Sequence, residues 1–277
     1  MMDFAFLWDF NAALFIGSSV LGLALFLGFD SAMDRAVLMR DLGIPIGLGG
    51  SLIGTQQLVY SASEGTLVAD GIYGWTGLAF LTLLYGGVFS ALGFFLSGSG
   101  RPPAKTIQNQ KWLWRRKLIS LLGGISITVP AMIYGGWELF FQPIPTTIFL
   151  VTAVIAILTG RKGHYLSNLS QGCLVGSLTS VLVGILILFK GEAESGLMVS
   201  GVGLIYGISG YVWIYIFTYS TDYRPQISAT RTNWHWIELT GFLIFMFLAP
   251  DTLLDNYQEA AAQEQIKQLE LRLDAMN

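Results

Sequence analysis

Residues 168–189 read NLSQGCLVGSLTSVLVGILILF, an apolar run without a charged side chain. A run of about 18 or more such residues has the length of a helix that crosses the hydrocarbon core of a bilayer. Comparable runs recur from Phe10 to Pro250, and none alternates polar with apolar residues. A membrane span must satisfy its backbone hydrogen bonds within one helix or a closed barrel. The sequence therefore predicts an all-α, polytopic transmembrane bundle.

The runs divide the chain into eight expected spans. They lie at 10–29, 44–60, 72–96, 118–141, 145–160, 168–189, 197–219 and 234–250. The fifth is short and begins beside Pro143 and Pro145, so a tilted or re-entrant element, with seven spans in total, stays open. We expect one transmembrane half at 1–100, a basic loop at 101–117, a second half at 118–250 and a polar segment at 251–277.

Composition agrees with a membrane protein and argues against several classes of function. Hydrophobic residues make up 53% of the chain and charged residues 12%, about half the charged fraction of a soluble domain. The net charge of −3 gives no reason to expect a nucleic-acid partner. The chain has one cysteine and two histidines, and no nucleophile–base pair or phosphate loop. We therefore expect no enzyme, no cofactor and no metal site.

The distribution of basic residues predicts which loops face the cytoplasm. The loop 101–117 carries six basic residues and no acid, and positive loops stay on the cytoplasmic side. Alternate loops that hold Arg35 and Arg40, Arg161 and Lys162, and Arg224 and Arg231 share that side. We expect a multi-pass protein of the cytoplasmic (inner) membrane, with loop 101–117 inside and, for eight spans, the C-terminal tail outside.

The tail at 251–277 has the pattern of a short amphipathic helix. Its apolar side chains follow a spacing of four, three, four and three residues: Ala262, Ile266, Leu269, Leu273 and Met276. This spacing is a heptad seam. The seam predicts either a helix that lies on its own protein or one that pairs with another chain.

Small residues recur every fourth position in two of the spans. They are Gly43, Gly47, Ser51 and Thr55 in one, and Gly172, Gly176, Ser180 and Gly184 in the other. Both spans contain Gly-Ser-Leu, and both precede a span with Leu-Tyr-Gly (84–86) or Ile-Tyr-Gly (205–207). This similarity favours a tandem, parallel repeat of a helix pair; chance likeness between glycine-rich helices is the alternative.

Small residues at this spacing let helix backbones approach closely in a membrane. We therefore expect six glycines to pack helices together, within the chain or between subunits: Gly43, Gly47, Gly50, Gly54, Gly176 and Gly184.

The residues GLGGSLIG at 47–54 and LTLLYG at 81–86 carry a family resemblance. Together they resemble the two pore-lining helices of the MotA/TolQ/ExbB proton-channel family, over about residues 45–95. The resemblance implies a homo-oligomeric ring around a single-span partner whose aspartate carries the ion. It also implies that Ser51, Thr82 and Thr55 line the ion path, with Pro45 near the cytoplasmic entrance.

Three functions remain after these observations. The first is a subunit of a membrane ion-driven channel or stator complex, which converts ion flow into mechanical work on a partner. The second is a small-solute transporter built from parallel repeats, with its substrate between Gln56, Gln57 and Tyr206. The third is a membrane scaffold or assembly subunit that docks a partner through the coil at 255–276.

Overall fold

The structure is a computed structural model, and it is helical almost throughout the part that it describes. That part comprises residues 13, 16–17, 19–20, 32–63, 69–97, 118, 122, 141–159, 165–219, 243, 245, 252, 262, 266–267 and 269. It contains five continuous helices: α2 (Ala32–Ser63), α3 (Ala69–Ser97), α6 (Pro143–Thr159), α7 (Tyr165–Leu188) and α8 (Ala193–Tyr219). The predicted all-α class is confirmed over these residues.

Four of these helices are long and apolar enough to cross a bilayer. The apolar segments are Arg35–Ser61 in α2, Ala79–Ser97 in α3, Asn168–Leu188 in α7 and Ala193–Tyr215 in α8. The short fifth helix, α6, has 17 residues and begins at Pro143, a position where a proline fits because the first helical N–H groups need no partner. The count of eight stays a prediction, because the spans expected at 10–29, 118–141 and 234–250 lie outside the described residues except for isolated positions.

The start of α2 differs from the expected span. We placed Arg35 and Arg40 in a loop before residue 44, but α2 begins at Ala32 and contains both of them. The expectation rested on the distribution of Lys and Arg between alternate loops. In the structure Arg40 is paired with the next residue, Asp41, and the helix runs without interruption through both charges. The loop placement was therefore wrong.

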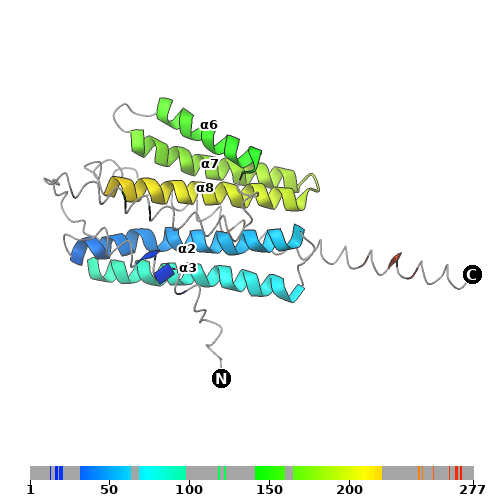
Figure 1. The fold of residues 1–277 in the computed structure, drawn as a ribbon, viewed down its shortest axis with the longest axis horizontal. Helices are drawn as coiled ribbons and strands as arrows, with labels where there is room; N and C mark the ends of the chain where they lie inside the picture. The colour runs from blue at the N-terminus through cyan, green and yellow to red at the C-terminus, as the bar shows by residue number, and fades with distance from the viewer. Residues whose placement is uncertain are drawn as a thin grey trace, which may run out of the picture.

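Two antiparallel helix pairs form the body of the molecule (Figure 1). Helix α2 packs along α3, α7 packs along α8, and α2 and α8 join the two pairs. Helix α6 lies on the outer side of α7, inclined to it, and α2 and α7 run in the same direction. The order across the molecule is α3, α2, α8, α7 and α6, so the central layer is the contact between α2 and α8.

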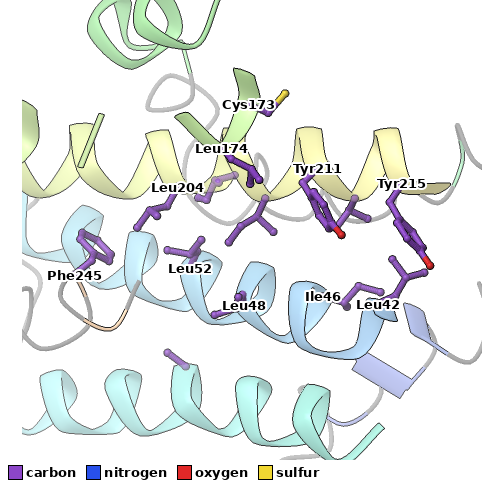
Figure 2. Close-up of a cluster of buried hydrophobic side chains, with 14 of the residues drawn as sticks. Leu42, Ile46, Leu48, Leu52, Cys173, Leu174, Leu204, Tyr211, Tyr215 and Phe245 are labelled. Atoms are coloured by element: carbon purple, nitrogen blue, oxygen red, sulfur yellow. The ribbon is translucent and has the colours of Figure 1, made fainter. Parts of the chain in front are cut away.

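The central layer is an apolar seam between α2 and α8 (Figure 2). Leu42, Ile46 and Leu52 of α2 are fully buried there, and α8 contributes Leu204 and Ile208. Lipid is as apolar as these side chains, so helices in a membrane are held together by close packing rather than by a hydrophobic gain. A sealed, close-packed seam therefore determines how the two pairs sit against each other.

The contact between α2 and α3 depends on glycine at both backbones. A Cβ atom added at Gly43 would lie 2.5 Å from the carbonyl oxygen of Gly86, and one at Gly47 would lie 3.0 Å from the carbonyl oxygen of Thr82. No side chain fits at these distances, because the atoms opposite are backbone. Small residues here bring the two helix axes close enough for polar groups of α2 and α3 to meet.

All six glycines named from the sequence lie against helices of the same chain. Gly43, Gly47, Gly50 and Gly54 lie against α3. The second set divides, because Gly176 lies against Thr152 and Phe149 of α6 whereas Gly184 lies against Gly196 and Ser200 of α8. The two spans with similar spacing thus use their small residues on different neighbours.

Candidate functional site: polar groups inside the bundle

Ser51 and Thr82, two of the three hydroxyl residues that the family resemblance selects, contact each other between α2 and α3. The Oγ atom of Ser51 lies 3.0 Å from the Oγ1 atom of Thr82, and the two residues are 0% and 7% exposed. Ser51 donates to the carbonyl of Ala79 at 2.5 Å, and Thr82 donates to the same carbonyl at 2.7 Å. The carbonyl of Gly47 lies 3.1 Å from Oγ of Ser51, so four oxygen atoms form one compact group inside the first helix pair.

The geometry of this group limits the ion that it can handle. Its oxygen–oxygen distances of 2.5, 2.7 and 3.0 Å are within hydrogen-bonding range, and the two hydroxyl hydrogens are distributed among these contacts and the Gly47 carbonyl. No cation fits among oxygens that already contact one another. A hydroxyl can both donate and accept and can rotate between partners, so the arrangement of Ser51, Thr82 and the Ala79 carbonyl is chemically suited to passing a proton.

Two further residues expected along the ion path lie on α2. Thr55 is buried and donates to the carbonyl of Ser51 at 2.9 Å, within its own helix. Pro45 is a buried residue inside α2 and not at its end. A proline has no N–H to give to the carbonyl four residues earlier, which here belongs to Asp41. Pro45 thus stands one helical turn from an acidic side chain.

Asp41 is a partly buried acid at the end of the α2–α8 seam. Its Oδ1 atom accepts from Nε of Arg40 at 3.1 Å, and its Oδ2 atom accepts from the Tyr215 hydroxyl of α8 at 2.7 Å. The side chains of Arg40 and Asp41 are 14% and 8% exposed. Figure 2 shows the Tyr215 hydroxyl directed toward α2. The carboxylate is therefore held from two helices.

Arg40 extends this group to α3. Its Nη1 atom makes a long contact of 3.5 Å with Oγ of Ser97, and its backbone carbonyl accepts from the Ser90 hydroxyl at 2.6 Å. The charged group consequently connects three helices, α2, α3 and α8. An ionisable residue within an apolar span is expensive and marks a functional site by default.

Sequence reasoning missed Asp41 because it treated the charges as the end of the span. One signal was available, since Ala36, Val37, Leu38 and Met39 form an apolar run just before Arg40. Gly93 of α3 also lies against the backbone of Ala36 and Arg40. An apolar run on each side of an Arg-Asp pair therefore indicates a helix that contains the pair.

The residues proposed for a transporter substrate are not brought together. The Gln56 side chain is 1% exposed, and its Nε2 atom lies against Gly201 of α8. Tyr206 points elsewhere, because its hydroxyl lies 3.2 Å from Oγ1 of Thr146 and its ring packs on Phe149, both on α6. The side chain of Gln57 lies outside the described residues. Gln56 of α2 therefore faces α8, whereas Tyr206 of α8 faces α6.

Three buried polar side chains have no hydrogen-bond partner among the residues that the structure describes. They are Gln56, with both amide atoms, and the hydroxyls of Ser177 and Ser180. The two serines lie against Gly207 and Gly203 of α8. In the second helix pair these hydroxyls therefore face glycines, which have no side chain to bond with them. The first pair differs, because its hydroxyls at Ser51 and Thr82 are paired.

The remaining expectations fall at the edge of the described part or beyond it. Within the described ranges, no three His, Cys, Asp or Glu residues come together in a way that could hold a metal ion. His164, His235 and the basic loop 101–117 lie outside those ranges. In the tail, Ile266 and Leu269 are helical and 56% and 59% exposed.

No family model matches this sequence, and no curated protein or solved structure matches it.

Proposed function

We propose that this chain is a subunit of a membrane proton channel of the stator type, in which proton flow drives movement of a partner. The observation that carries the proposal is the Ser51–Thr82 contact of 3.0 Å between two apolar helices. The resemblance to the MotA/TolQ/ExbB helix pair selects the same two residues. Their burial next to a shared carbonyl supports a proton rather than a larger cation.

The proposal has a physical basis in the cost of polar groups within lipid. An interhelical hydrogen bond in a membrane contributes only about 0.6 kcal/mol on average, so the hydroxyls add little to folding. A hydroxyl that accepts a proton, releases its own to the other hydroxyl and then rotates would pass a proton between Ser51 of α2 and Thr82 of α3 without moving a helix. In the proposed complex, copies of the chain surround a single-span partner that carries an aspartate.

The arrangement of the helices is compatible with the remaining parts of the proposal. Helices α2 and α7 run in the same direction (Figure 1), which supports a tandem, parallel repeat. The ends of α3, α6 and α8 and the starts of α2 and α7 lie at one end of the bundle. Basic segments follow or precede those ends in the sequence, and this end would face the cytoplasm of the inner membrane.

The direct test is Thr82→Val in the complex purified from membranes and reconstituted into liposomes. Valine keeps the shape of threonine and removes the hydroxyl, so we expect proton flux, followed with a trapped pH-sensitive dye, to fall by about tenfold or more if a relay group is lost. Thr82→Ser keeps the hydroxyl and retains flux.

The matched control is Thr179→Val. Thr179 lies on α7 and donates only within its own helix, to the carbonyl of Val175 at 2.8 Å. We expect this variant to conduct like the wild type. Equal flux in the wild type and in Thr82→Val, with intact assembly, would contradict the assignment of Thr82 to the proton path.

A further inference from the structure

Asp41 is an acid within the span of α2 for which the family resemblance provides no role. In the proposed stator the ion-carrying aspartate belongs to a partner, yet this chain holds a partly buried carboxylate of its own between α2 and α8. It lies in the apolar segment Arg35–Ser61 with its side chain 8% exposed. An ion pair largely removed from water, such as Arg40–Asp41, contributes little to the stability of the fold, because the cost of desolvating the two charges offsets their attraction. Another reason for its presence is therefore required.

The two carboxylate oxygens of Asp41 have different surroundings. Oδ2 accepts from the Tyr215 hydroxyl at 2.7 Å, and Oδ1 accepts from Nε of Arg40 at 3.1 Å. The titratable groups in contact with the carboxylate include Arg40 of α2 and Tyr215 of α8. From α3, the Ser97 hydroxyl contacts Arg40 at 3.5 Å and offers the guanidinium a second acceptor. Arg40 therefore has an alternative partner close to Asp41.

The position of Asp41 relates it to the hydroxyl group of the first helix pair. Ser51 follows ten residues later on the same helix, about 15 Å along the axis. The Ser51–Thr82 contact lies toward the middle of α2 and α3, whereas Asp41 lies toward the end of α2 that also holds Arg35. A proton that reaches the hydroxyl group from this end of the bundle passes the level of Asp41.

We propose that Asp41 is the proton-binding site of this chain at that end of the bundle, an assignment that rests on the proposed proton channel. A proton from water adds to Oδ1, the oxygen that faces Arg40, and later leaves it, so one O–H bond forms and breaks. The Arg40–Asp41 pair changes from neutral to a single positive charge and back. Tyr215 keeps its hydrogen bond to Oδ2 in both states and acts as a positioning residue. While Asp41 is protonated, Arg40 turns to Ser97.

The test compares Asp41→Asn with Asp41→Glu in the purified complex. We expect Asp41→Asn to lower the initial proton flux into liposomes by about 100-fold or more, as when a positioned proton-transfer group is lost, and Asp41→Glu to retain measurable flux. Native mass spectrometry checks that both variants assemble. Wild-type flux in an assembled Asp41→Asn complex would overturn the assignment while leaving the proposed function standing.

An infrared measurement separates this inference from the proposed function. In a pH titration, the carbonyl stretch of a protonated carboxylic acid is followed as a difference spectrum in the wild type and in Asp41→Asn. We expect a band that shifts in D₂O and is absent from Asp41→Asn. If the wild type shows this band but conducts no protons, the proposed function is wrong and the assignment of Asp41 as a proton site stands. If the band is unchanged in Asp41→Asn, the assignment of Asp41 is wrong.

Tyr215→Phe provides the second variant if Asp41→Asn fails to assemble. Phenylalanine preserves the packing against Tyr211, whose ring centroid lies 6.2 Å away, and removes the hydroxyl. We expect the Asp41 band to change frequency and to titrate at a different pH, an effect that loss of packing alone does not produce. An unchanged band and unchanged titration would overturn the assignment of Tyr215 and of the carboxyl that it contacts.

Discussion

At the scale of single residues, Gln56 is the side chain whose chemistry fits its surroundings least. It is buried at the α2–α8 contact with no hydrogen-bond partner for either amide atom in the described part of the chain. A buried polar group without a partner costs about 1–3 kcal/mol. Gln56→Met keeps an unbranched side chain of similar length. We expect the variant to be more stable by about 1 kcal/mol, measured by unfolding in mixed detergent micelles.

A matched control is Gln142→Met, because that carboxamide has a partner. Its Nε2 atom lies 3.2 Å from the sulfur of Met198. We expect no gain in the free energy of unfolding for this variant. If Gln56→Met is instead destabilised, the carboxamide has a bound partner such as a water molecule, and the buried group is a binding site.

Some residues of the candidate site could be predicted from the sequence and others could not. Ser51 and Thr82 were identified because a motif names them, and they meet across the helix pair. Asp41 was missed because the charge beside it was assigned to a loop, whereas Arg40 and Tyr215 surround it in the structure. A partner from a distant helix is invisible to reasoning along one segment.

At the scale of helices, two adjacent glycines of α3 have opposite environments. A Cβ atom at Gly86 would collide with the backbone of Gly43 and Gly47 of α2, whereas one at Gly87 meets no atom within 4 Å. We expect Gly86→Ala to force α2 and α3 apart and to destabilise the protein by about 1–3 kcal/mol. Gly87→Ala gains helix propensity of about 1 kcal/mol. Thermal unfolding of the two variants in detergent provides the comparison.

Equal melting temperatures for these two alanine variants would be incompatible with the close contact between α2 and α3. The pair is informative because the substitutions are chemically identical and adjacent in sequence. The two positions differ only in the direction of the Cα–Cβ bond, which points at α2 from Gly86 and into open space from Gly87.

The existence of the helices follows from the sequence more readily than their rotation does. Uncharged apolar runs gave α3, α7 and α8 to within a few residues of the observed ends. These helices are apolar on nearly all sides, so the sequence has no polar stripe to indicate which face is buried. That is why Gln56 and Tyr206 were expected to meet, although they lie against α8 and α6 respectively.

At the scale of the whole molecule, large apolar side chains remain exposed on the outer helices. Phe95 of α3 is 81% exposed and Leu158 of α6 is 77% exposed. These outer faces are of the kind that lipid or other subunits cover in a membrane. The proposed stator makes a specific prediction about composition.

We expect native mass spectrometry of the complex, extracted in mild detergent, to give a homo-oligomeric ring with fewer copies of a single-span, aspartate-bearing protein. Release of that protein without loss of the ring, at higher detergent concentration, would identify it as the enclosed partner. A monomer or dimer alone would contradict the stator proposal.

The two helix pairs differ in their resistance to sliding. Ser51 and Ser90 donate across the α2–α3 contact at 2.5 and 2.6 Å, and any axial displacement breaks both bonds. Across α7–α8, Ser200 donates at 3.4 Å, and Ser177 and Ser180 end on glycine backbone without a partner. Few hydrogen bonds therefore resist shear between α7 and α8, whereas the Tyr215–Asp41 bond of 2.7 Å holds α8 to α2. A small displacement is therefore accommodated at the α7–α8 contact, and α8 stays with the α2–α3 pair.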